Sequence, residues 1–154
     1  MEFVRIDETG RFVETIQFDP EGKFHPSIKW WPFNTLQEKK AALLYSIRAM
    51  RWAVENGGIE ILPGVRVKTD ALSQSKIAGA IQLFDNDPSL VSMDFESDEN
   101  VWQTFDQPTM LAIGVAVGRH VQACFSHARV LQEAILAATN DADLSEIDIY
   151  SGWP

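Results

Sequence analysis

The sequence predicts an α+β protein in which an N-terminal β-hairpin or meander precedes a helical domain with two short hairpins and a long C-terminal helix. Three observations predict this fold class. Two stretches near the N-terminus, residues 3–6 and 12–18, are rich in β-branched and aromatic residues. Three longer stretches beyond residue 34 repeat apolar residues with a helical period. Glycine, proline and acidic turn signals separate the helical stretches from short β-rich segments.

The N-terminal segment contains two Asp-x-x-Gly units, which begin at Asp7 and Asp19. Both are typical of tight turns, because aspartate accepts hydrogen bonds from the turn backbone and glycine takes a positive φ. A short third strand is expected over residues 23–29. The Trp-Trp-Pro segment at 30–32 then predicts a stiff, extended exit from the sheet.

The first long helix is expected to reach about Glu55. Asn34 or Thr35 caps it, with Gln37 and Glu38 available for the capping-box position. An Asn-Gly-Gly sequence ends it. Its apolar residues recur near one face: Leu36, Leu43, Ile47, Met50 and Val54.

The middle of the chain predicts a hairpin followed by a second helix. Residues 59–62 and 65–69 flank a Pro-Gly turn. Asp70 is the expected cap of a helix over residues 71–84, in which small alanines allow close packing. An Asp-Asn-Asp-Pro sequence stops that helix.

A second hairpin, over residues 90–95 and 101–105, leads into the longest helix. Asp106 is its expected cap, and the helix is predicted over residues 108–138 with a proline tolerated in the first turn. One more helical turn is expected near residue 143. The long helix carries a continuous apolar stripe: Ile113, Val117, Val121, Cys124, Ala128, Leu131 and Ile135.

Composition limits the classes of partner. The formal net charge of −9 disfavours nucleic acid, whose phosphates an acidic surface repels. No stretch reaches the roughly 18–20 apolar residues that span a bilayer, so membrane insertion is not expected. The lone cysteine, Cys124, cannot form an internal disulfide. The first residues lack a basic and apolar leader, which favours synthesis in a cytoplasm.

One group of residues invites a chemical interpretation. His120, Cys124 and His127 lie at i, i+4 and i+7 of the long helix, and imidazole and thiolate both suit zinc. Their spacing along two turns does not converge on one ion, however, and Cys124 sits within the apolar stripe. We therefore expect a buried cysteine that acts as a small hydrophobe. No catalytic residue, metal ligand or cofactor site is predicted.

Two further patterns have structural interpretations. Gly114 and Gly118 form a small-x-x-x-small pattern, which predicts the close approach of another helix or strand. An acidic run lacks the spacing of a calcium loop and is expected at a solvated hairpin tip. The run comprises Asp85, Asp87, Asp94, Glu96, Asp98 and Glu99.

Residues 1–33 are predicted to be a docking element, and residues 34–154 to be the helical domain. A small sheet has little core of its own and gains by covering a face or edge with another chain. Tryptophan is enriched at protein interfaces, although a sugar ring also stacks on it. The expected partner-contact residues are Phe12, Ile16, Phe18, Trp30 and Trp31.

Several stretches of the helical domain are similar to one family: residues 41–58, 67–70, 75–80, Trp102 with Phe105, 116–125 and 147–154. Through them, residues 36–154 resemble an uncharacterised domain family of tailed bacteriophages and prophages. That family occurs in tail-fibre, tail-fibre-assembly and neighbouring tail proteins. The pattern consists of scattered matches and contains no catalytic signature.

The resemblance implies a non-enzymatic structural component of a phage tail, at the baseplate, fibre or tail tip. The expected partners are other tail proteins, with a second copy of this chain among the candidates. The expected location is the virion. Two alternatives stay open: a tail-fibre assembly chaperone that is absent from the finished particle, and a metal- or carbohydrate-binding module.

Overall fold

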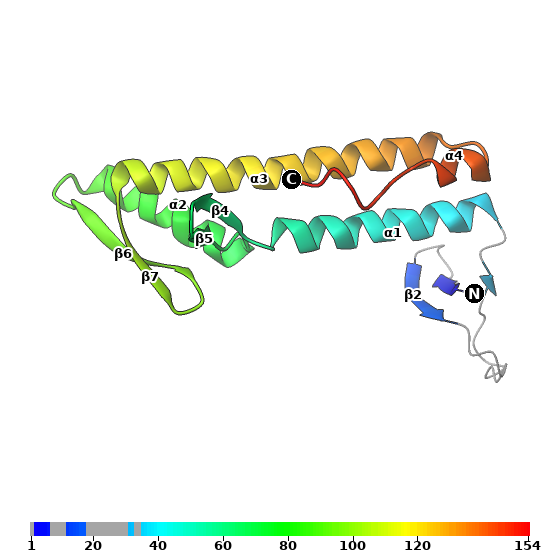
Figure 1. The fold of residues 1–154 in the computed structure, drawn as a ribbon, viewed down its shortest axis with the longest axis horizontal. Helices are drawn as coiled ribbons and strands as arrows, with labels where there is room; N and C mark the ends of the chain where they lie inside the picture. Colours follow the sequence, from blue (N-terminus) through cyan, green and yellow to red (C-terminus); the bar gives the residue numbers. More distant parts are fainter. Residues whose placement is uncertain (1, 7–11, 18–30, 33–34) are drawn as a thin grey trace. The chain divides into compact units, whose positions relative to one another are not determined.

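A computed structural model describes residues 2–6, 12–17, 31–32 and 35–154, and it describes side chains from residue 35 onward (Figure 1). The fold is α+β, as predicted. Its elements in chain order are β1 (Glu2–Ile6), β2 (Phe12–Gln17), β3 (Trp31–Pro32), α1 (Leu36–Glu55), β4 (Ile59–Leu62), β5 (Val65–Val67), α2 (Ala71–Asn86), β6 (Ser92–Asp98), β7 (Val101–Asp106), α3 (Gln107–Ala137) and α4 (Asp141–Ser145).

The chain divides into two compact units. The first comprises Met1–Ala49 and Ala128–Ser151, and the second comprises Met50–His127 and Gly152–Pro154. Helices α1 and α3 therefore each contribute residues to both units. The predicted division after residue 33, into a docking element and a helical domain, stays a prediction.

The N-terminal strands form an antiparallel sheet in the order β2-β1-β3. β1 pairs with β2 so that Phe3 lies opposite Ile16, which confirms the predicted hairpin. Trp31 and Pro32, expected only as a stiff exit, pair with β1 as a third strand. A proline is tolerated there because β3 has a single described neighbour. Both predicted turns and the strand predicted over residues 23–29 lie outside the described residues.

Helix α1 begins with the predicted capping box. The Thr35 backbone N–H donates to Glu38 Oε2 at 3.0 Å, and the Glu38 N–H donates to Thr35 Oγ1 at 3.2 Å. Thr35 is therefore the cap, and two backbone donors at the helix start are satisfied. The predicted apolar face is only partly covered: Ile47 is buried, and the other four members are half-buried.

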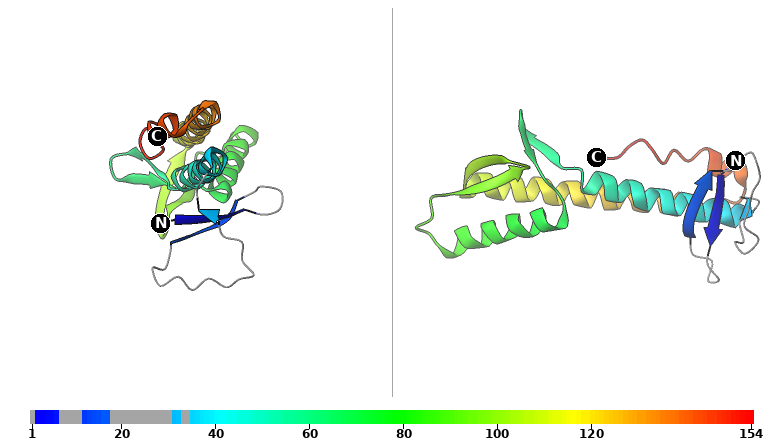
Figure 2. Two further views of the ribbon diagram at one scale, coloured as in Figure 1. Left: turned by 90° about the vertical axis from the view of Figure 1, so that its right-hand side faces the viewer. Right: turned by 90° about the horizontal axis from the view of Figure 1, so that it is seen from below.

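The second unit builds its core from α2, the first part of α3 and the two hairpins, β4–β5 and β6–β7. Figure 2 shows α2 running alongside the first part of α3. The predicted cap Asp70 accepts from the backbone N–H groups of Leu72 and Ser73. Hydrogen bonds from Ser73 lower the pKa of the Asp70 carboxyl, and the bond from the Ser73 hydroxyl has the largest effect. The buried core comprises Val67, Ile77, Ala80, Phe84, Phe105, Met110, Ile113 and Val117.

Helix α3 follows the predicted pattern along its whole length. Asp106 Oδ1 accepts from the Thr109 N–H at 3.0 Å and caps the helix. Five members of the predicted stripe are buried, and Val121 and Ala128 are half-buried. Asn140 caps the short helix α4, so this last turn begins slightly earlier than expected. Among the helices that the structure describes, none has the length and apolarity to span a bilayer.

A buried threonine joins the end of α1 to the end of β5. Thr69 is fully buried. Its hydroxyl donates to the Glu55 carbonyl at 2.5 Å and accepts from the Gly58 N–H at 2.9 Å. Gly58 has φ +78°, a conformation that glycine adopts without steric cost. The hydroxyl therefore satisfies two backbone groups at the point where the chain leaves α1.

Leu131→Ala should lower the free energy of unfolding by about 2–5 kcal/mol, because Leu131 is only 7% exposed on the α3 stripe. Urea denaturation followed by circular dichroism measures the change. Val130→Ala is the matched control, because Val130 is the next residue of α3 but is 63% exposed. A loss below about 0.5 kcal/mol for Leu131→Ala, the range of surface substitutions, would contradict this packing.

Thr69→Val should cost about 1–3 kcal/mol of unfolding free energy, because valine keeps the shape but leaves the Gly58 N–H and the Glu55 carbonyl without their partner. The same denaturation measurement applies. Thr104→Val is the control, because the Thr104 hydroxyl is exposed and donates only to the exposed Asp94 carboxylate. Equal stability of the two variants would show that the Thr69 hydrogen bonds contribute little.

Candidate protein-contact groove

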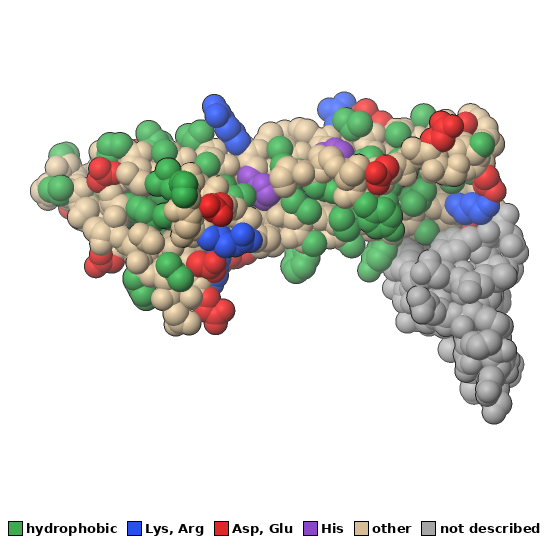
Figure 3. All heavy atoms as spheres, in the orientation of Figure 1, with side chains coloured by type: hydrophobic (Ala, Val, Ile, Leu, Met, Phe, Trp, Pro, Cys, Tyr) green, Lys and Arg blue, Asp and Glu red, His purple; other side chains and the backbone are tan. Residues whose placement is uncertain are grey.

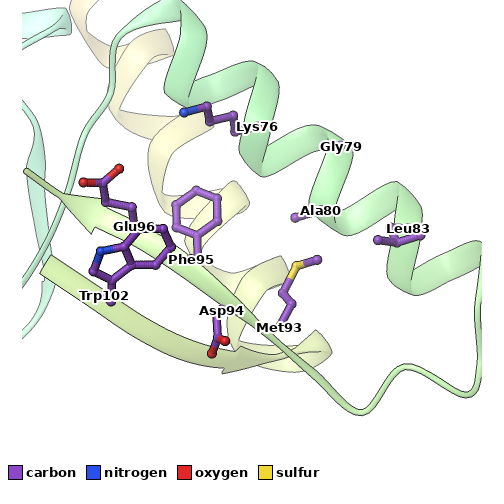
Figure 4. Close-up of a pocket in the computed structure, with 9 residues that line it drawn as sticks. All are labelled: Lys76, Gly79, Ala80, Leu83, Met93, Asp94, Phe95, Glu96 and Trp102. Atoms are coloured by element: carbon purple, nitrogen blue, oxygen red, sulfur yellow. The ribbon is translucent and has the colours of Figure 1, made fainter. Parts of the chain in front are cut away.

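A groove with a volume of about 350 Å³ lies between α2 and the β6–β7 hairpin (Figure 4). We call it the hairpin groove. Four of its lining residues come from α2 and five come from the two strands. They are Lys76, Gly79, Ala80 and Leu83 on the helix, and Met93, Asp94, Phe95, Glu96 and Trp102 on the hairpin.

The strand β6 supplies the apolar wall of the groove through its two-residue period. Met93 and Phe95 are half-buried, and Figure 4 shows their side chains pointing toward α2. Asp94 and Glu96 alternate with them and are exposed. Phe95 also packs against Phe105 of β7, with ring centroids 6.3 Å apart. The alternation therefore places apolar side chains on the floor of the groove and carboxylates at its edge.

The helix wall is open because two successive residues are small. A Cβ atom added at Gly79 would meet no atom within 4 Å. Ala80 is buried and forms part of the core beneath the groove. Leu83, one turn further along, is exposed at the groove's edge. The groove is thus a shallow apolar hollow beside the helix.

Trp102 stands at one end of the hairpin groove and is 67% exposed. It lies directly opposite Glu96 in the strand register. Glu96 accepts from the Asn100 N–H at 3.0 Å in the hairpin turn, where Asn100 has φ +57°. Asp94 accepts from the Thr104 hydroxyl at 2.8 Å. Both carboxylates therefore accept hydrogen bonds from groups within the same hairpin.

The chemistry of this lining suits contact with an apolar or aromatic group. None of the nine lining residues is a histidine, cysteine or serine, so the groove contains no nucleophile paired with a base. An exposed tryptophan beside an apolar hollow offers a large contact area at small entropic cost. The lysine and the carboxylates at the edge add polar contacts of both signs.

Cys124 is buried, as predicted, within the second unit. Its Sγ atom lies 3.9 Å from His120 Nε2, but that nitrogen is also 3.0 Å from the Val54 carbonyl. Burial raises the pKa of the Cys124 thiol, and the Glu55 carboxylate raises it further. The thiolate that nucleophilic catalysis needs is therefore disfavoured.

The His127 side chain contacts a different part of the chain from His120. Its ring meets Trp153 edge-on, with centroids 4.7 Å apart. A Cβ atom at Gly152 would lie 2.9 Å from His127 Cε1, so the chain passes close to this ring at a glycine with φ +80°. The structure thus gives His120 and His127 different neighbours. Among the described residues, no group of three or more histidine, cysteine or acidic side chains is arranged to hold a metal ion.

The acidic run divides among local hydrogen bonds. Asp85 accepts from the Gln107 amide at 2.9 Å. Asp87 accepts from the Ser89 hydroxyl and backbone, and these bonds lower the pKa of its carboxyl. Asp98 lies 3.9 Å from the Arg66 guanidinium. The prediction of a hairpin tip is right for Asp98 and Glu99 but wrong for Asp85 and Asp87, which lie at the end of α2, whereas Asp94 and Glu96 lie along β6.

The predicted partner-contact residues of the N-terminal segment stay predictions. The structure places the backbones of Phe12 and Ile16 in β2 and that of Trp31 in β3. Phe18 and Trp30 lie outside the described residues, and so do the side chains of all five.

A family model described as "Domain of unknown function (DUF4376)" matches residues 38–149, which is most of the chain. The chain belongs to this family. No curated protein matches it, and no solved structure matches it.

The DUF4376 region contains every residue that lines the hairpin groove. It ends before Trp153, so the contact of this residue with His127 lies partly outside the match. Sequence reasoning found the hairpin but missed the groove. The available signal was the strict alternation of β6 together with a tryptophan on the paired strand, a combination that marks a two-sided sheet with one exposed aromatic residue.

Cys124 should react slowly with a thiol reagent in the native protein and rapidly after unfolding, because burial both blocks access and disfavours the thiolate. Spectrophotometric titration with an aromatic disulfide, with and without urea, measures the two rates. Free glutathione at the same pH is the reference. A native rate equal to that of glutathione, or one equivalent of bound zinc, would contradict the buried placement.

Proposed function

We propose that this chain is a non-enzymatic structural component of a bacteriophage tail that acts through protein–protein contacts. One observation carries the contact role: Trp102 is exposed beside the apolar floor of the hairpin groove. Interface hot spots are enriched in tryptophan and lie in well-packed pockets. The assignment to a tail rests on the resemblance of residues 36–154 to a domain family of tailed bacteriophages, as inferred from the sequence.

Other exposed apolar residues support a contact role. Figure 3 shows hydrophobic side chains reaching the surface over α1 and over α3. Tyr45 on α1 and Phe125 on α3 are each exposed by nearly half. Singly exposed apolar residues are normal on any protein, so these carry less weight than the tryptophan at the groove.

The chemistry of the described residues favours a contact role over catalysis. Cys124, the one cysteine, has a raised thiol pKa. Asp94 and Glu96 are engaged in hairpin hydrogen bonds instead of facing one another as an acid and a base. The net charge of −9 disfavours a nucleic-acid partner.

Mass spectrometry of washed particles from the phage or induced prophage that encodes this chain tests the proposal. A structural component should be present at a fixed ratio to the other tail proteins. Presence in the lysate but not in the particle would favour the assembly chaperone. Absence from both the particle and all tail-protein complexes would overturn the tail assignment.

Trp102→Ala should reduce incorporation into particles, or co-purification with tail proteins, because truncating a hot-spot tryptophan costs about 2 kcal/mol or more of binding. Quantitative mass spectrometry of the complexes measures the loss. Trp52→Ala is the matched control, since Trp52 is exposed to a similar extent, 65%, but lies outside the groove. Equal effects of the two substitutions would remove the hairpin groove as the contact site.

A further inference from the structure

A second hollow, of about 370 Å³, lies on another side of α2, between this helix and α3. None of its nine lining residues is charged. We call it the uncharged face. The residues that shape it are Gln74, Ala78 and Ile81 on α2, and Leu111, Val115 and Gly118 on α3.

The uncharged face carries a ridge and a hollow side by side. Leu111 is 52% exposed and Val115 is 47% exposed, one turn apart on α3. Ala78 and Gly118 are exposed but small, and a Cβ atom added at Gly118 would meet nothing within 4 Å. A surface that holds both a protrusion and the space for one is self-complementary, as an isologous two-fold contact requires.

Close packing of the two helices creates this arrangement. A Cβ atom at Gly114 would lie 2.6 Å from Ile81 Cδ1, so the glycine lets the isoleucine side chain pack directly against the α3 backbone. The prediction of close approach is confirmed at Gly114, where α2 is the neighbour. At Gly118 the described structure leaves the space open. Of the two glycines in the small-x-x-x-small pattern, Gly114 therefore allows α2 to pack closely, and Gly118 leaves open space on the surface.

Charges of opposite sign flank the two ends of the uncharged face. Asp85 follows Ile81 by one turn of α2 and accepts from Gln107 at the start of α3. Arg119 follows Val115 by one turn of α3. Both are exposed. Gln107 and Arg119 are twelve residues apart on one helix, or about 18 Å at 1.5 Å per residue.

This polarity favours a second copy as the occupant. A two-fold axis through the middle of the face would bring the acidic end of each copy to the basic end of the other. Two ion pairs would form around an apolar centre. Because each Asp85 is paired with an Arg119, the contact adds no net negative charge, which matters because each copy carries a net charge of −9.

We propose that two copies of this chain associate through the uncharged face in a two-fold arrangement. Leu111 and Val115 of each copy fill the hollow at Ala78 and Gly118 of the other, and Arg119 pairs with the partner's Asp85. This inference does not depend on the tail assignment. The hairpin groove stays outside the contact, because α2 lines it with a different set of residues.

The first test is the mass of the full chain in solution, measured by light scattering and sedimentation equilibrium. The wild type should be a dimer. Val115→Arg should raise the dissociation constant at least about tenfold, because it places two like charges near the axis without burying either in the monomer core. Val130→Arg is the control on the same helix, away from the face.

The second test reads the orientation of the two copies. Arg119→Asp and Asp85→Arg should each weaken the dimer, and the double variant should restore it, because exchanging the charges recreates both pairs. Lys76→Asp, a charge reversal on α2 that is outside the face, should leave the dimer unchanged. Circular dichroism confirms that each variant is folded.

Three results would overturn the proposal. One is a wild type that stays monomeric at its highest soluble concentration. Another is a dimer that Val115→Arg does not weaken, which would assign association to a different surface. The third is a double variant no tighter than either single charge reversal. Absence from phage particles with an intact dimer would count against the tail role alone.

Discussion

Three segments of the second unit meet at the hydrogen bonds of one buried threonine. Thr69 joins the Glu55 carbonyl at the end of α1 to the Gly58 N–H at the start of the hairpin. Its own carbonyl accepts from the Gln74 amide on α2 at 2.7 Å. A buried donor or acceptor without a partner is costly, so these hydrogen bonds stabilise the junction of the three segments.

The residues next to Thr69 extend this junction in both directions. Val67 is part of the core, and the Lys68 N–H donates to the Ser97 carbonyl of β6 at 3.0 Å. Asp70 caps α2. The two walls of the hairpin groove, α2 and β6, are therefore both attached to four consecutive residues. Met93 and Phe95 of β6 also pack against the core to which α2 contributes Ile77, Ala80 and Phe84, so the two walls meet at the base of the groove.

The sequence predicted the local features and missed those that depend on distant partners. Caps at Thr35, Asp70 and Asp106 follow from short-range hydrogen bonding, and the α3 stripe follows from the helical period. Predicting the groove requires knowing which face of β6 packs toward α2, and no local sequence pattern gives this information. The pairing of Trp31 with β1 was missed for the same reason, because proline indicates a strand end but not its neighbour.

Helix α2 explains why two surfaces can coexist on so small a unit. Its residues 76, 79, 80 and 83 line the hairpin groove, and its residues 74, 77, 78 and 81 line the uncharged face. The run Ala78-Gly79-Ala80 makes the helix thin at its middle, so both hollows approach its backbone. Small residues have little side chain to bury, and the helix is held instead by its cap, by Ile77 and Phe84 in the core, and by Ile81 against Gly114. A helix stabilised at a few points leaves both flanks available for contact with other chains.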